Sequence, residues 1–415
     1  MKSMIKFIKK SKLLNFLLFK IGTVILGLGI NILIVKKITV QEYGEYTLIM
    51  ATLSIVSIFA FQSLNGVMMT FGNKEKIKNG RYNKSFTACM LMIGMELFFS
   101  LIFLKIYILI YNLELNKFYL IFVILTLIRA LTDFITQYFL IEEKQIFSSF
   151  LLFLSRIIGL ILINYIKSLE TLLNIQAIYE GFVLIGIFLI KKDRLVPVEF
   201  NREIFINSIK FSLWQLFGLL GVMGIQNLLN IIIEKKISLK ELAIYGLAYR
   251  FYAVISNFAY MFVSYYYSEV VNAFENKNIL KIKELYYKKR VYVIILSLIM
   301  HIIGYYILFY LIKFYYDNLY LNSLSILKIL FLASFIRYIY TFYISYINSN
   351  GYNTIYQILN IFGGVLTVIC SVILIDRYQI LGIATAVLIG NILILILSLI
   401  IFEKKILKIV KRKVN

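Results

Sequence analysis

Apolar residues run along this chain in long stretches that short polar segments separate. Each stretch is about 20 residues long, which is the length an α-helix needs to cross a hydrocarbon core about 30 Å thick. The pattern therefore predicts an all-α membrane protein with twelve transmembrane helices. We expect these spans at 13–35, 44–68, 86–110, 118–140, 146–165, 171–190, 211–233, 243–268, 291–312, 324–347, 354–375 and 381–402.

Composition agrees with a membrane environment. Hydrophobic residues make up 61% of the 415 residues, and the mean hydropathy is +0.85, so the chain has more apolar surface than a soluble core could bury. Lys and Arg number 44 against 21 Asp and Glu, a net charge of +23. In a soluble protein this excess would suggest nucleic acid. Here it lies mostly between the spans, where it indicates membrane orientation, and we expect no nucleic-acid partner.

One helical hairpin occurs twice. Residues 31–60 and 230–259 align without a gap at an offset of 199, and 12 of the 30 positions are identical. In a second match, Ile128-Arg129 and Ile336-Arg337 lie 208 residues apart. Six spans precede the second copy, so the repeats should be parallel, related by an axis along the membrane normal. We expect an N-terminal lobe at 1–190 (spans 1–6), a cytoplasmic linker at 191–210 and a C-terminal lobe at 211–415 (spans 7–12 and a basic tail).

The distribution of basic residues predicts the orientation. With a cytoplasmic N-terminus, the inside segments carry 28 Lys or Arg and the outside loops carry 9. The positive-inside rule then places both termini in the cytoplasm.

Several function classes find no support in the sequence. The outside loops are about a dozen residues or shorter, which leaves no room for an extracytoplasmic catalytic domain, and no GxxxxGK[ST] motif indicates an ATP-driven pump. No nucleophile and base stand together, one histidine cannot form a zinc site alone, and Cys89 and Cys370 lie inside apolar stretches. We expect neither an enzyme nor a cofactor or metal.

Charged residues deep inside the spans are the main functional signal. A charge at the bilayer centre costs about 2.5–3.5 kcal/mol on insertion scales, so each should face a partner or a water-filled cavity. Because cations outnumber acids, we expect a cationic central cavity. Arg129 could instead be neutralised by Asp133 at i+4, with the charges only joining helices. The cations are Lys20, Arg129, Arg156, Arg250 and Arg337, and the acids are Glu96, Asp133 and Glu180.

Polar residues extend this candidate site. Asn31 and Asn230 occupy the same position of the repeat, and Gln226 lies one turn before Asn230. With the five cations, these three residues form the expected substrate-binding set. The three acids and His301 are candidates for coupling to a proton or ion gradient, although a single histidine is also typical of a hydrogen bond between helices. Lys105 and Lys328 lie near span ends, where their amines can reach the interface.

Two local segments have their own interpretation. Asn276–Arg290 places Ile279, Ile282, Leu285 and Tyr286 on one face and lysines around the rest, so we expect a basic amphipathic helix that contacts anionic lipid headgroups at the inner leaflet. Gly363-Gly364 indicates close packing of helices rather than a substrate contact.

The first hairpin resembles a known family. Lys36-Lys37-Ile38-Thr39, followed by the GxY element in Tyr43-Gly44-Glu45-Tyr46, is similar to the first two spans of the polysaccharide-biosynthesis or O-antigen flippases. The segment Ser268–Arg290 is similar to the loop after span 8 in that family. This family belongs to the multidrug/oligosaccharidyl-lipid/polysaccharide exporter superfamily.

The resemblance implies a MATE-like flippase in a bacterial cytoplasmic membrane. Its substrate would be a polyprenyl-pyrophosphate-linked oligosaccharide, moved from the inner to the outer leaflet by alternating access, and other membrane proteins of glycan assembly would be candidate partners. Two alternatives stay open. One is a multidrug extruder of the same superfamily, which would need buried acids in excess, and the other is a membrane polysaccharide polymerase or ligase.

Overall fold

Helices form nearly all of the described chain in a computed structural model, which describes residues 12–60, 64, 67–111, 113–142, 144–189, 199–276, 278–316, 318–349 and 353–410. Nine stretches within these residues are long and apolar enough to cross a membrane, so this is a multi-pass membrane protein. They are Leu18–Lys37, Asn83–Leu109, Asn116–Phe139, Gln145–Tyr165, Leu169–Phe188, Arg202–Val222, Ile279–Tyr315, Asn318–Tyr340 and Gln357–Lys408.

The last of these stretches contains two predicted spans. Helix α15 (Asn353–Ser398) is interrupted at Gln379, whose φ of 49° and ψ of −133° are not helical. The predicted spans 44–68 and 243–268 overlap α3 (Val40–Ala60) and α11 (Leu239–Glu275), which are helical but not among the nine stretches. The total of twelve spans and the cytoplasmic position of both termini therefore stay predictions.

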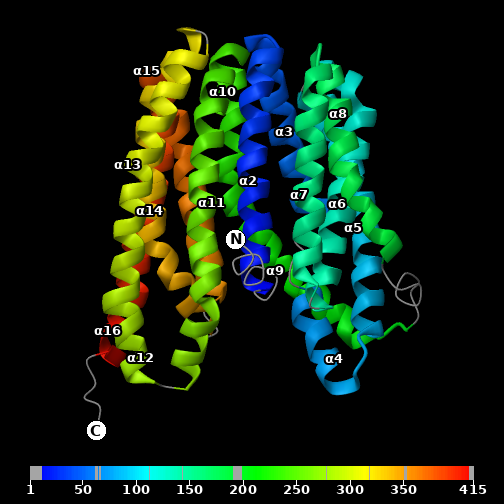
Figure 1. The fold of residues 1–415 in the computed structure, drawn as a ribbon, viewed down its shortest axis with the longest axis vertical. Helices are drawn as coiled ribbons and strands as arrows, with labels where there is room; N and C mark the ends of the chain where they lie inside the picture. Colours follow the sequence, from blue (N-terminus) through cyan, green and yellow to red (C-terminus); the bar gives the residue numbers. More distant parts are fainter. Residues whose placement is uncertain are drawn as a thin grey trace, which may run out of the picture. The chain divides into compact units, whose positions relative to one another are not determined.

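The chain divides into two compact units, and the first runs from Met1 to Leu216. Within it, α2 lies along α7, and α6 contacts α3, α5, α7 and α8 (Figure 1). Large aromatic side chains such as Phe86, Phe134, Tyr138 and Phe139 fill one part of its core. Its main helices are α2 (Lys12–Lys37), α3, α4 (Asn73–Asn79), α5 (Asn83–Tyr111), α6 (Tyr119–Ile141), α7 (Gln145–Leu162) and α8 (Leu169–Gly181), followed by the 3-10 helix η5 (Phe182–Leu189).

The second unit runs from Phe217 to Asn415. Helix α14 lies along α11 and also contacts α13 and α15. The division between the units falls inside α9 (Arg202–Gln226), after the predicted linker, whose residues 191–198 lie outside the described part. The remaining helices are α10 (Leu228–Lys236), α11, α12 (Ile279–Glu284), α13 (Arg290–Tyr315), α14 (Ser323–Ser349), α15 and α16 (Lys404–Val410).

Both units repeat the same helix pairings. In the first unit α2 packs on α7, and α3 packs on α5 and α6. In the second unit the matching helices do the same: α10 packs on α15, and α11 packs on α13 and α14. These pairings support the internal repeat that the sequence predicts.

Glycines at the repeat offset mark close helix contacts in both units, between α2 and α7 in the first and between α9 and α15 in the second. A Cβ on Gly22 would lie 2.5 Å from Cε2 of Phe153 on α7. On Gly221, 199 residues later, it would lie 2.5 Å from the backbone carbonyl carbon of Asn360 on α15. A Cβ on Gly364 would collide with the carbonyl oxygen of Gly221. The close helix packing predicted for Gly363-Gly364 is therefore confirmed.

The basic segment is helical but covers protein with its apolar face. Asn278 caps α12, since its side chain accepts a hydrogen bond from the Lys281 N–H at 3.0 Å. Ile282, Leu285 and Tyr286 are buried, and α12 contacts α11 and α16. This face is therefore unavailable to lipid. Leu280 and Tyr287 are exposed, and Lys277 lies outside the described residues.

A half-buried carboxylate joins three segments at the same end of the second unit. Glu403, in the π-helix η9 (Leu399–Glu403), accepts two hydrogen bonds from Nη1 of Arg290, both at 3.3 Å. The hydroxyls of Tyr286 and Tyr343 also donate to Glu403. The Arg290 guanidinium lies 4.9 Å from the centroid of the Tyr286 ring. The start of α13, the C-terminal part of α14 and the segment after α15 are therefore linked through one side chain.

Candidate functional site

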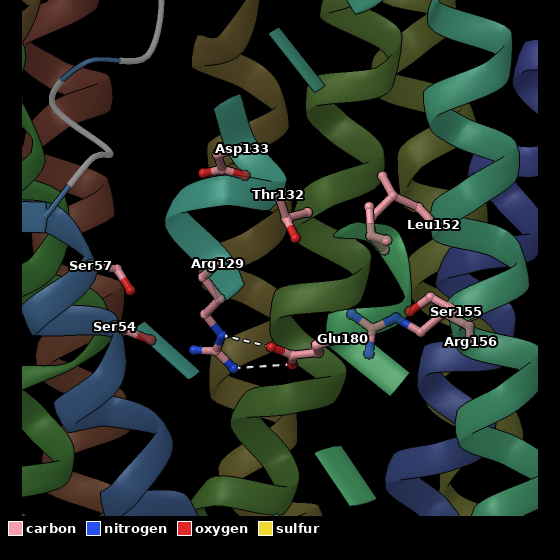
Figure 2. Close-up of a pocket in the computed structure, with 10 residues that line it drawn as sticks. Ser54, Ser57, Arg129, Thr132, Asp133, Leu152, Ser155, Arg156 and Glu180 are labelled. Carbon is pink, nitrogen blue, oxygen red and sulfur yellow. Dashed lines mark hydrogen bonds and ion pairs between the residues drawn. The ribbon is translucent and has the colours of Figure 1, made fainter. Parts of the chain in front are cut away.

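A polar cavity of about 270 Å³ lies within the first unit. Residues of α3, α6, α7, α8 and η5 line it, and four of them are charged residues that the sequence singled out (Figure 2). The lining residues are Ser54, Ser57, Arg129, Thr132, Asp133, Leu152, Ser155, Arg156, Glu180 and Val183.

Arg129 pairs with Glu180 rather than with Asp133. Its Nε donates to Oε2 of Glu180 at 3.0 Å and its Nη2 to Oε1 at 3.2 Å, a two-point contact between α6 and α8. Figure 2 shows the Arg129 side chain extending away from Asp133 and toward Glu180. The sequence interpretation that Asp133 neutralises Arg129 is therefore wrong. The i+4 spacing brings the side chains of Arg129 and Asp133 near each other on one helix. The Glu180 carboxylate, on the facing helix α8, accepts from both Nε and Nη2 of Arg129, which is the stronger contact.

The Arg129–Glu180 pair continues into a hydrogen-bonded network. Nε2 of Gln176 donates to Oε1 of Glu180 at 2.7 Å, and the Tyr46 hydroxyl donates to Oε1 of Gln176 at 3.0 Å. The Glu180 carboxylate thus accepts from two residues, which compensates for its removal from water. Arg129 is therefore held in place between α3 and α8.

Arg156 is the second guanidinium of the cavity and has weaker partners. Its Nη1 lies 3.4 Å from the Tyr179 hydroxyl, and the guanidinium lies 5.4 Å from the centroid of the Tyr179 ring. Within the described residues it forms no ion pair. Figure 2 shows it extending from α7 toward the Glu180 side of the cavity. Its N–H donors are therefore available to an anion in the cavity.

Asp133 completes the charges of this cavity. It is half-buried on α6 and forms no hydrogen bond or ion pair with any residue that the structure describes. The lining thus holds two guanidinium groups and two carboxylates. The excess of cations predicted for a central cavity is absent from this one.

The other expected cations do not line this cavity. Lys20 is exposed on α2, with its amine 5.7 Å from the centroid of the Phe16 ring. Arg250 is half-buried on α11, and Arg337 is buried on α14. Arg250 and Arg337 belong to the second unit. A joint site with the first unit remains a prediction.

The repeated asparagines differ in burial. Asn31 is half-buried in α2, whereas Asn230 is buried in α10, and its Oδ1 has no hydrogen-bond partner among the described residues. The side chain of Gln226 lies outside the described part. An amide oxygen that is buried without a donor is costly, so the Asn230 position is consistent with a polar ligand or water.

Two candidate coupling residues lie outside the cavity. Oε1 of Glu96 accepts a hydrogen bond from the Ser212 hydroxyl at 3.1 Å. His301 is buried on α13, and its Nδ1 lies 2.7 Å from the carbonyl oxygen of Ser297 on the same helix. The His301 hydrogen bond expected between helices is thus within one helix. No three His, Cys, Asp or Glu side chains among the described residues form a group that could hold a metal ion.

Some cavity residues were absent from the sequence-based set. Ser54 and Ser57 lie one turn apart on α3, and each donates to a carbonyl of its own helix, at 2.8 and 2.6 Å. Ser155 precedes Arg156 on α7. The i, i+3 spacing of Ser54 and Ser57 and the position of Ser155 beside an intramembrane arginine were the available signals in the sequence. Small hydroxyl residues occur throughout apolar helices, so these signals are not specific.

Known proteins resemble this chain in structure rather than in sequence. The sequence matches no protein family and no curated protein. An inward-facing multidrug resistance MATE family transporter of the MOP superfamily aligns with a TM-score of 0.70 and 13% identity, over 96% of both chains. The lipid II flippase MurJ, in an inward closed conformation, aligns with a TM-score of 0.70 and 15% identity, over 95% of this chain and 90% of its own. The eukaryotic MATE transporter AtDTX14 aligns with a TM-score of 0.57 and 11% identity. The MATE-like fold is therefore established.

Proposed function

We propose that this protein is a flippase that moves a polyprenyl-pyrophosphate-linked oligosaccharide from the cytoplasmic to the outer leaflet of a bacterial membrane. Two observations support a transport function: the fold is shared with MATE transporters and with the lipid II flippase MurJ, and a polar cavity lies among apolar helices. The observation that carries the proposal is Arg156, a guanidinium in that cavity that forms no ion pair within the described residues.

The chemistry of the substrate fits such a group. A pyrophosphate cannot cross hydrocarbon unaided, and a guanidinium binds phosphate oxygens through two parallel hydrogen bonds. Arg129 already donates to Glu180, so Arg156 is the better anion ligand of this cavity. Access of this cavity first to one side of the membrane and then to the other would complete the transport cycle.

Asp133 favours a second candidate, export of organic cations by a multidrug transporter of the same fold. Asp133 has no hydrogen-bonding partner among the residues that the structure describes, so its carboxylate attracts a cation as Arg156 attracts an anion. The two functions differ in which side chain is essential.

Proteoliposomes containing the purified protein separate these functions. The substrate is a fluorescent polyprenyl-pyrophosphate disaccharide, and the measurement is the rate at which it becomes accessible to a membrane-impermeant quencher. We expect Arg156→Ala to slow translocation at least about tenfold, as expected for loss of a charge-assisted contact. Arg156→Lys should retain part of the rate, and Asp133→Asn most of it.

Lys105→Gln is the matched control. Lys105 is a cation near a span end of the same unit, and its amine donates to Asn116 at 3.1 Å outside the cavity. Normal translocation by Arg156→Ala would contradict the proposal. Uptake of tetraphenylphosphonium that requires Asp133 and not Arg156 would establish the multidrug alternative.

A further inference from the structure

A second cavity, of about 470 Å³, lies within the second unit between α13 and α14. Its volume is in the range of about 300–1,000 Å³ that small-molecule sites occupy. Most of its lining is apolar or aromatic, and Leu298, Ile302, Tyr306 and Leu332 are also exposed at the surface of the unit. In a membrane this groove opens toward lipid rather than water.

Its polar groups follow an order along the two helices. The amine of Lys328 lies 5.9 Å from the centroid of the Tyr305 ring, near the start of α14. One turn from Tyr305 lies His301, whose ring lies 5.6 Å from that of Phe331 and 5.9 Å from that of Phe335. The groove therefore has a cation at one end and an imidazole at mid-depth. Leu298 and Phe335 line its apolar far end.

The imidazole presents an unused acceptor to this groove. The His301 side chain is 6% exposed, and its Nδ1 lies 2.7 Å from the Ser297 carbonyl oxygen, so Nδ1 carries a proton and donates. In the neutral ring Nε2 is then an acceptor, and it has no hydrogen-bond partner among the described residues. A buried acceptor that lacks a donor is costly, which favours a ligand with a hydroxyl at this depth.

Lys328 adds a charge requirement. It is exposed and forms no ion pair with a carboxylate of the described residues, so its ammonium is available to a phosphate. A ligand that matches this groove would have an anionic head at Lys328, a hydroxyl at His301 and an apolar chain beyond His301.

We propose that this groove binds a monoacyl glycerophosphate, a single-chain lipid whose free hydroxyl lies between its phosphate and its acyl chain. The phosphate contacts Lys328, the hydroxyl donates to Nε2 of His301, and the chain packs against Phe331, Phe335 and Leu298. The site lies in the second unit, apart from the Arg156 cavity, and is independent of the transported substrate.

Equilibrium binding to the full chain in phosphatidylcholine nanodiscs tests the site. The probes are radiolabelled 1-oleoyl-glycerol-3-phosphate and its 2-deoxy analogue, which keeps the charge and chain but lacks the hydroxyl. We expect the wild-type protein to bind the deoxy analogue about fivefold more weakly, because one hydrogen bond is lost. Equal binding of the two probes by the wild-type protein overturns the proposal without any variant.

Three variants refine the result. His301→Phe should bind both probes equally, since the aromatic packing is kept and the acceptor is removed. Lys328→Gln should weaken both probes about fivefold. Lys313→Gln is the matched control: Lys313 is an exposed lysine at the end of α13, with its amine over Phe309 and Phe314 and outside the groove. Equal effects of Lys313→Gln and Lys328→Gln, or displacement of the lipid by inorganic phosphate, would contradict a lipid site.

Discussion

Arg129 on α6 and Glu180 on α8 form a two-point ion pair, with Nε and Nη2 of the guanidinium 3.0 and 3.2 Å from the two carboxylate oxygens. Their side chains are 24% and 13% exposed, so both charges are largely removed from water. A pair in this setting depends on its partners, because each charge that loses its counterpart stays buried without compensation.

Glu180→Ala should therefore destabilise the protein by about 3 kcal/mol, the lower range for breaking a buried pair. Thermal unfolding in detergent measures the effect. Asp133→Ala should cost far less, because Asp133 has no hydrogen bond to lose within the described residues. The double change Arg129→Met and Glu180→Leu should recover most of the loss. A larger loss for Asp133→Ala than for Glu180→Ala would contradict the observed pairing.

Arg337 is the matching cation of the second repeat, and it is buried on α14. We predict that Arg337→Ala abolishes translocation of the lipid-linked disaccharide while the protein still inserts into the membrane. Arg337→Lys should keep part of the activity, since lysine keeps the positive charge but cannot bind a phosphate through two parallel hydrogen bonds. Arg377→Gln, which changes an exposed arginine of α15, is the control. If Arg337→Ala is expressed normally and translocates at the wild-type rate, Arg337 does not bind the substrate and has a structural role only.

Close packing of α9 on α15 gives a prediction about stability. Gly221→Ala would place a methyl group against the backbone of Asn360, so the helices must separate, at a cost of about 1–3 kcal/mol. Gly27→Ala on α2 is the control, because no side chain or neighbouring helix of the described part lies within 4 Å of the added Cβ, and alanine should stabilise the helix by up to about 1 kcal/mol. Unfolding midpoints of both variants in the same detergent decide the matter. The midpoint should fall for Gly221→Ala and rise for Gly27→Ala.

Glu42 predicts a dependence of stability on pH. Partial burial raises the pKa of its carboxyl, but hydrogen bonds from the Thr39 N–H (2.9 Å), the Thr39 hydroxyl (3.0 Å) and the Leu169 N–H (3.3 Å) outweigh this and hold the pKa below its ordinary value. A lowered pKa in the folded state stabilises the protein above the unfolded pKa of about 4.3, and this contribution is lost as the pH falls further.

Glu42→Gln should therefore lower the unfolding midpoint at pH 7 and have almost no effect near pH 3. Loss of a carboxylate at two helix N-termini corresponds to about 0.5–1 kcal/mol. Glu170→Gln removes an exposed carboxylate from the first turn of α8 and serves as control. A difference between wild type and Glu42→Gln that grows toward acid pH would reverse the assigned sign.

Single cysteines test the orientation in a background without Cys89 and Cys370. The positions Gln41 and Lys240 should react with an impermeant thiol reagent from outside, whereas Asn79 and Asn278 should not. All four side chains are exposed, so a lack of reaction reports the side of the membrane rather than burial. Reaction of positions 41 and 240 from opposite sides would contradict parallel repeats.

The sequence predicts the helices and the repeat well because both depend on local features. Apolar length specifies a span, and the boundary that a polar turn predicts near residues 376–380 coincides with the kink at Gln379. The close approach at Gly364 was also readable, since a helix surface without side chains admits a neighbouring backbone.

Pairing between helices was not readable in the same way. Arg129 has acids on its own helix and on α8, and the chain alone gives no facing angle that would choose Glu180 over Asp133. The same limit applies to the apolar face of the basic segment, because the chain alone does not show that this face packs against α11 and α16. The Thr39-x-x-Glu42 spacing is a capping signal for a helix that begins at Val40, four residues before the predicted span at 44–68.

Glu403 has a mechanical consequence. Because Arg290, Tyr286 and Tyr343 all donate to this one carboxylate, the start of α13, the C-terminal part of α14 and the segment that leads into α16 are tied together at that end of the second unit. If α13 slides along α14 at this end, either these hydrogen bonds break or α16 moves with the two helices. If these bonds are kept, α16 moves together with α13 and α14 whenever the second unit changes shape.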